Sequence, residues 1–94
     1  MGYRISYYQQ VLDDDIPALP ETIKKRVKQA IEERLLTNPD MYGKPLRKGL
    51  SGFRKLRIGD WRIIYGIEGE NVTILLISHR SKVYQVVFHR LPAP

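Results

Sequence analysis

The chain contains no cysteine, which removes several kinds of chemistry at once. Disulfide bridges, thiolate metal sites and a cysteine nucleophile are all excluded. Long apolar runs are also missing, because the longest, NVTILLIS at residues 71–78, is far shorter than the ~20 residues that cross a membrane. Residues 1–12 are interrupted by Arg4, Gln9 and Gln10 and do not resemble a signal peptide. We therefore expect a soluble, cytoplasmic protein with no membrane partner.

Acidic residues are scarce in only one half of the chain. Residues 1–43 carry six Lys or Arg and seven Asp or Glu, whereas residues 44–94 carry ten and three. This asymmetry indicates an anionic partner that meets the C-terminal half, with nucleic acid as the leading candidate. The alternative is a basic surface that serves only solubility.

The N-terminal half predicts a strand followed by helices. The 94 residues suffice for one domain with a modest core, so we take 1–94 as a single domain. Apolar and polar residues alternate over residues 3–11, which predicts a strand. Asp13–Asp15 are expected to cap a helix before a turn at residues 16–19. Residues 21–39 predict an amphipathic helix that stops at Asn38-Pro39. Its apolar stripe consists of Ile23, Val27, Ala30, Ile31 and Leu35.

The C-terminal half predicts mainly strands. Residues 40–52 form a loop rich in Gly and Pro, and strands follow at 53–58, 61–68 and 71–78, joined by short turns. The segment at 81–91 fits either a strand or a helix, and the spacing of Val83 and Val87 favours the helix. The fold class is therefore α+β: an N-terminal strand, two helices, a three-stranded antiparallel meander and a short C-terminal element. We expect the helices on one face of the sheet.

The first hairpin has a register that can be worked out. A two-residue turn at Gly59-Asp60 pairs Arg57 with Arg62, and paired residues share a face of the sheet. One face then receives Leu56, Ile58, Trp61 and Ile63, and the other receives Lys55, Arg57 and Arg62, with Phe53 and Ile64 alongside. Two opposed arginines repel each other unless an anion such as a phosphate lies between them. The alternative is that both extend into water, or that Asp60 or Glu68 neutralises one.

Titratable side chains gather where the third strand of the meander ends. His79, Arg80, Lys82 and Tyr84 follow that strand within six residues. Since the end of this strand lies beside the first hairpin in a meander, we expect these four side chains to rim the same basic face. A lone His or Tyr at such a position is ordinarily structural, so the prediction rests on their convergence.

Residues 46–84, LRKGLSGFRKLRIGDWRIIYGIEGENVTILLISHRSKVY, resemble the RelE-type toxins of bacterial toxin–antitoxin systems. The loop PLRKGLSG, the hairpin RIGDWRIIY, the apolar strand and the ending HRSKVY carry the likeness, which extends over nearly the whole chain. The resemblance implies a microbial-RNase-like fold and a ribosome-dependent endoribonuclease, an mRNA interferase, that cuts mRNA in the ribosomal A site and inhibits translation. It also implies a cognate antitoxin, no cofactor and no metal.

In such toxins the 2′-hydroxyl of the substrate attacks the adjacent phosphate. The resemblance implies catalytic roles for Lys55, Arg57, Arg62, Arg80 and Tyr84, and His79 joins them as a candidate acid because its free pKa lies near neutrality. Which of Tyr84, Lys55 and His79 acts as acid or base stays open. The expected RNA-binding residues are Lys44, Arg47, Lys48, Phe53, Arg54 and Lys82.

Two other functions remain open at this point. The related ParE-type toxins share the fold and the hairpin but poison DNA gyrase and cut no RNA. A basic RNA-binding module without activity would show the same charge pattern. The complete ending HRSKVY favours the RNA-cleaving branch.

Overall fold

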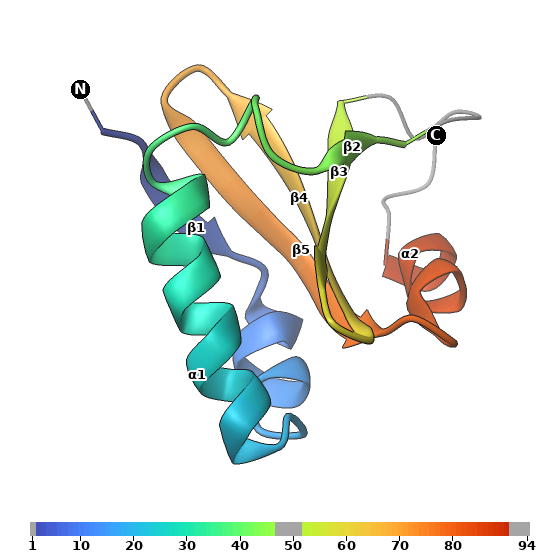
Figure 1. Cartoon of the computed structure of the whole chain (residues 1–94). Helices are drawn as coiled ribbons and strands as arrows, with labels where there is room; N and C mark the ends of the chain where they lie inside the picture. Colours follow the sequence, from blue (N-terminus) through green and yellow to red (C-terminus); the bar gives the residue numbers. More distant parts are fainter. Residues whose placement is uncertain (1, 47–51, 91–94) are drawn as a thin grey trace.

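Five strands form one mixed sheet in the computed structural model, which describes residues 2–46 and 52–90 (Figure 1). The strands are β1 (Arg4–Tyr7), β2 (Lys44–Pro45), β3 (Phe53–Ile58), β4 (Trp61–Glu68) and β5 (Asn71–His79), in the spatial order β1-β5-β4-β3-β2. β3, β4 and β5 form the predicted antiparallel meander, and β1 adds to β5 in parallel. The short edge strand β2 lies in the segment predicted to be loop.

Helices precede and follow the meander. A first helical segment starts at Gln9 and ends in the π-helical turn η1 (Val11–Asp15), while α1 (Glu21–Ala30) continues directly into η2 (Ile31–Leu35). The predicted amphipathic helix is therefore confirmed. The C-terminal element is the helix α2 (Val83–Arg90), as the valine spacing favoured. No helix in the described part of the chain has the length and apolar character needed to cross a membrane.

One helix boundary was predicted wrongly. Asp13–Asp15 end the first helical segment instead of capping the start of a helix. The reason is a tertiary contact, since the Asp15 carboxylate accepts a hydrogen bond from the backbone N–H of Ile77 and forms an ion pair with Arg90. Residues 16–19 form a turn, as expected.

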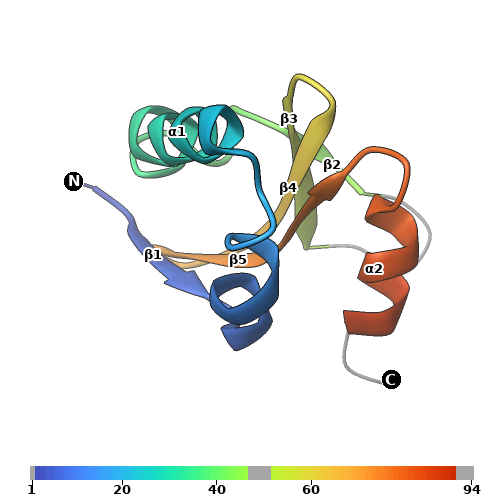
Figure 2. The same cartoon turned by 90° about the horizontal axis from the view of Figure 1, so that it is seen from below.

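The sheet separates two hydrophobic clusters, one on each face. Figure 2 shows α1 and α2 on opposite sides of the sheet. The helices of residues 9–35 cover one face, where Val27, Ile31 and Leu35 pack against Leu56 and Ile63. α2 covers the opposite face. The expectation that the helices share one face therefore holds only for the N-terminal ones. The second cluster consists of Leu46, Ile64, Leu75, Leu76, Val83 and Val87.

A β-bulge explains why α2 packs on the second face. Opposite β5, Ile64 pairs with Leu76 but Tyr65 pairs with Ile74, so Leu75 has no partner in β4. A bulge of this kind lets two successive side chains point the same way. Leu75 and Leu76 both belong to the second cluster and are fully buried. The apolar patch they create is what α2 covers.

Candidate functional site

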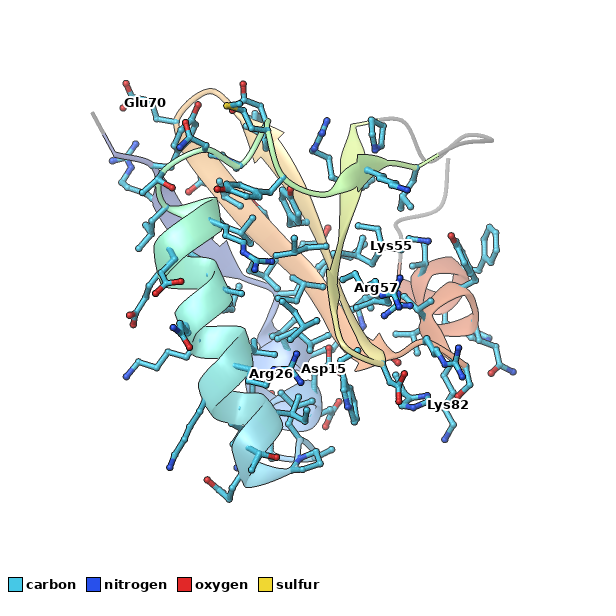
Figure 3. The ribbon with its side chains drawn as sticks, in the orientation of Figure 1. Asp15, Arg26, Lys55, Arg57, Glu70 and Lys82 are labelled. Carbon is cyan, nitrogen blue, oxygen red and sulfur yellow. The ribbon has the colours of Figure 1, made fainter. Side chains whose placement is uncertain are left out.

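The register predicted for the first hairpin is confirmed. Arg57 lies opposite Arg62, and Lys55 lies opposite Ile64. β2 adds a second like-charged pair that was not foreseen, because Lys44 lies opposite Lys55. The side chains of Lys44, Lys55, Arg57 and Arg62 thus line one surface, which we call the basic face. Figure 3 shows Lys55 and Arg57 on the side of β3 that faces α2.

A shallow hollow of about 450 Å³ adjoins the basic face. All four cations line it, together with the segment Met41–Gly43 that leads into β2. Among the described residues, no carboxylate lies within 4.0 Å of any of these cations, so neither Asp60 nor Glu68 neutralises them. Uncompensated cations around a concave surface create a positive potential that attracts anions, phosphate included.

Tyr84 meets the basic face from α2. The ammonium of Lys55 donates a hydrogen bond of 2.9 Å to the Tyr84 hydroxyl and lies 5.1 Å from the centre of its ring. Tyr84 is 45% exposed, because it flanks the apolar stripe of Val83 and Val87 that docks the helix. A strand and a helix therefore place two groups that can exchange protons beside two arginines. The expected convergence is confirmed for Tyr84.

The two opposed arginines differ in their surroundings. The guanidinium of Arg62 donates hydrogen bonds to the carbonyl oxygens of Gly59 (2.8 Å) and Trp61 (2.9 Å). Gly59 occupies the left-handed turn position, with φ of 59°. Arg57 is exposed, and within the described residues its guanidinium makes no hydrogen bond or ion pair. Arg62 is therefore fixed by the backbone of the turn, whereas Arg57 is free to contact a ligand.

The structure does not bring His79 to the basic face. His79 lies opposite Trp61, so both point to the α1 side of the sheet, and their rings meet edge-on with centres 5.4 Å apart. Its Nδ1 accepts a hydrogen bond from the Ser81 backbone N–H at 3.2 Å. Lys82 lines the same separate hollow of about 360 Å³ as His79.

The remaining predicted residues are dispersed. Arg80 pairs with Asp60 at 3.7 Å, an exposed contact of small energetic value. Phe53 packs against the second cluster, and its ring lies against Gly66. Arg54 points to the other face of the sheet, where it donates hydrogen bonds to the carbonyl oxygens of Tyr42 and Gly43. Arg47 and Lys48 lie outside the described residues.

Tyr65 supports the site but was not singled out in the sequence. Its hydroxyl lies 2.7 Å from the carbonyl oxygen of Pro39 and 2.6 Å from that of Tyr42, and shares its one proton between these two acceptors. This contact holds the wall of the hollow in place. Burial raises the pKa of Tyr65, and the neighbouring positive charge of Arg54 partly offsets this effect. Alternation along β4 predicts a core position here, but no local signal reveals the partners of the hydroxyl.

Comparison with known proteins identifies the class. Residues 3–84 match the family described as ParE toxin of type II toxin-antitoxin system, parDE. The chain belongs to this family, within the RelE/ParE superfamily of toxins. Toxin RelE of Mycobacterium tuberculosis is 38% identical over 74 residues, which are 77% of this chain and 76% of that protein.

Solved structures agree on the fold. The toxin–antitoxin complex RelBE2 from Mycobacterium tuberculosis contains a chain that superposes with a TM-score of 0.78 at 30% identity, covering 85% of this chain and 100% of that one. A doubly mutated E. coli toxin RelE in the free state gives a TM-score of 0.77 over 98% of this chain and 100% of that one. At 20% identity, the second likeness shows the fold alone.

Proposed function

We propose that this toxin is a metal-independent endoribonuclease that cleaves mRNA in the ribosomal A site. The observation that carries the proposal is the 2.9 Å hydrogen bond between Lys55 and Tyr84 beside the opposed arginines of the basic face. Such an arrangement combines groups that exchange protons with fixed positive charge. The similarity to proteins named toxin RelE supports the same activity.

The chemistry divides naturally among these side chains. The 2′-oxygen forms a bond to phosphorus while the bond to the 5′-oxygen breaks; the 2′-hydroxyl loses a proton and the leaving 5′-oxygen gains one. Negative charge gathers on the phosphoryl oxygens, where Arg57 and Arg62 stabilise it without changing protonation state. Lys55 and Tyr84 are the groups of this site that can transfer protons. Because Lys55 donates to the Tyr84 oxygen, the phenolic proton remains available to a substrate oxygen.

Two macromolecular partners follow from this function. The hollow is shallow and open, so the reacting 2′-hydroxyl and phosphate must be aligned by something larger than the toxin, and the ribosome supplies that alignment. A cognate antitoxin is the second partner, since a similar chain occurs in the RelBE2 toxin–antitoxin complex. Both partners imply action in the cytoplasm.

The test is cleavage of a defined mRNA with and without programmed ribosomes. We expect cuts only with ribosomes, growth arrest when the toxin is expressed alone, and loss of both effects in Arg57→Ala. Lys25→Ala is the matched control, because Lys25 is an exposed cation on α1, remote from the basic face. Efficient cleavage of naked RNA, or RNA binding without any cleavage, would contradict the proposal.

Inhibition of DNA gyrase is the second candidate, favoured by the family that residues 3–84 match. The two functions leave different traces in the same cells. Gyrase inhibition would halt growth with transcripts intact and plasmid supercoiling reduced, whereas mRNA cleavage would leave supercoiling unchanged. Measuring both after induction decides between them.

A further inference from the structure

The edge of β5 is completed by side chains where β1 ends. β1 pairs with β5 only as far as Ile74. Beyond that point, the backbone N–H of Ile77 donates to the Asp15 carboxylate at 2.9 Å, and the carbonyl oxygen of Leu75 accepts from Arg90 at 3.2 Å. Buried backbone groups need such partners. Asp15 and Arg90 thus bind the backbone groups of β5 that a longer β1 would otherwise pair.

The same two side chains bind tightly to each other. The guanidinium of Arg90 contacts both carboxylate oxygens of Asp15, at 2.6 and 3.1 Å, and the side chains are only 11% and 10% exposed. A forked, charge-assisted pair of this kind fixes direction as well as distance. It joins η1, β5 and the last residue of α2, elements separated by up to 75 positions in the sequence.

The other contacts that hold α2 on the sheet are mainly apolar. It has eight residues, and only Val83 and Val87 are buried in the second cluster. Val86 is half-buried and also packs against this cluster. Apolar contacts of this kind set how deeply the helix sits on the sheet, whereas a forked ion pair also fixes its direction and so its roll about its own axis. Arg90 continues the stripe of Val83 and Val87 one turn later and is anchored to Asp15, whereas Tyr84 lies in the first turn.

We propose that Asp15 and Arg90 are positioning residues for Tyr84: their ion pair fixes the roll of α2 and so holds the Tyr84 hydroxyl on Lys55. The catalytic consequence rests on the function proposed above. A side chain about 6 Å from a helix axis moves by about 2 Å when the helix rolls by about 20°. That displacement breaks a hydrogen bond of 2.9 Å, and misplacement of about 1 Å in a reacting group can cost about 10²-fold in rate.

Arg90→Lys is the decisive variant, because it keeps the charge and the helix but loses the fork. Asp15→Asn is its counterpart, since it keeps an acceptor for Ile77. Asp14→Asn is the matched control, because Asp14 is a neighbouring exposed carboxylate that forms no hydrogen bond or ion pair with the described residues. Each protein is first shown to unfold cooperatively, so that an unfolded variant is not mistaken for a mispositioned one.

One measurement reads the position directly and does not depend on activity. The Lys55 side chain lies against the Tyr84 ring, so its ε-methylene proton signals are shifted by the ring current. We expect Arg90→Lys and Asp15→Asn to move these signals towards the values seen in Tyr84→Ala, and Asp14→Asn to leave them unchanged. Unchanged Lys55 signals in folded Arg90→Lys and Asp15→Asn would overturn the inference, whatever the toxin cleaves.

The second measurement is a double-mutant cycle on the single-turnover rate of ribosome-bound mRNA cleavage. Arg90→Lys should lower the rate at saturating toxin by about 10- to 100-fold and leave the half-saturating concentration within about 2-fold. In the Tyr84→Phe background the same change should cost less than about 2-fold, because the hydroxyl it positions is gone. Equal losses in both backgrounds would overturn the positioning role. Absence of cleavage by the wild type would refute the proposed function and leave the ring-current result to decide the inference.

Discussion

Replacing Tyr84 by Phe removes one oxygen and keeps the ring, so it separates the chemistry of this residue from its packing. The hydroxyl accepts one hydrogen bond, from Lys55 at 2.9 Å. Because Tyr84 is 45% exposed, water can replace the lost partner of Lys55. The free energy of unfolding should therefore fall by only about 0.5–1 kcal/mol, which lowers Tm by about 4–8 °C at most in a domain of this size.

The effect on cleavage should be much larger. A positioned general acid or base contributes about 10²–10⁴-fold to a rate, so we expect Tyr84→Phe to lose about 10²-fold in single-turnover cleavage of ribosome-bound mRNA. Primer extension on a defined message measures the rate, and thermal unfolding of the same preparation measures the fold. Tyr84→Ala should be equally inactive and still folded, since truncating a half-exposed ring costs well under the ~3–5 kcal/mol of a buried one.

Two results would refute this reasoning. A fully active Phe variant beside an inactive, folded Ala variant would show that the ring stacks on a base of the message. A fully active Phe variant beside an unfolded Ala variant would show that Tyr84 only packs. Either result removes the hydroxyl from proton transfer and leaves Lys55 as the group of the basic face that can exchange a proton.

Three further predictions concern the basic face and its supports. Arg57→Gln should lower cleavage by about 10²-fold, yet raise Tm slightly at low salt because the opposed like charge is relieved. Gly43→Ala should cost at least about 3 kcal/mol in urea unfolding, because φ is 71° and a Cβ would lie 2.7 Å from the Tyr65 hydroxyl; Gly69→Ala, with φ of 61° and no atom within 4 Å, should cost only about 1 kcal/mol. Burial raises the pKa of Tyr65 above 10.0, so the folded protein favours the neutral phenol more than the unfolded chain does. The stability that the buried phenol contributes should therefore be complete below pH 10 and lost as the pH rises above it. Thermal unfolding measured from pH 8 to 11 should show a smaller loss of stability in Tyr65→Phe than in the wild type. Some loss should remain in this variant, because burial also raises the pKa of Tyr7.

Local rules predicted the first hairpin because everything that sets its register lies within ten residues. The turn at Gly59-Asp60 fixes which side chains face each other, and the opposed arginines follow directly. The same reasoning fails one strand later. From the turn at Gly69-Glu70 a regular register would place His79 on the face of Arg62. The bulge at Leu75 shifts the register by one residue, and His79 moves to the face of Trp61.

Long-range contacts explain what else escaped the sequence. Asp15 looks like a helix cap because its partners, Ile77 and Arg90, lie 62 and 75 residues away. The strand β2 escaped because it has only two residues, one of them Pro45, which is tolerated only at a sheet edge. Neither feature has a periodic pattern to reveal it. β2 supplies Lys44 to the basic face, and Asp15 binds the last residue of α2, the helix that carries Tyr84.

The two opposed arginines carry a cost in electrostatic repulsion, which the turn that joins their strands partly offsets. Pairing them on neighbouring strands costs repulsion, and no carboxylate of the described residues relieves it. The turn relieves it in part, since two backbone carbonyl oxygens accept from Arg62 and hold its guanidinium towards Gly59. A cation held in this way needs no reorganisation when negative charge develops nearby, which is the condition for effective electrostatic stabilisation of a transition state. In the proposed reaction Arg57 keeps its full donor capacity for the phosphate, so the pair combines one fixed charge with one that can follow the reacting group.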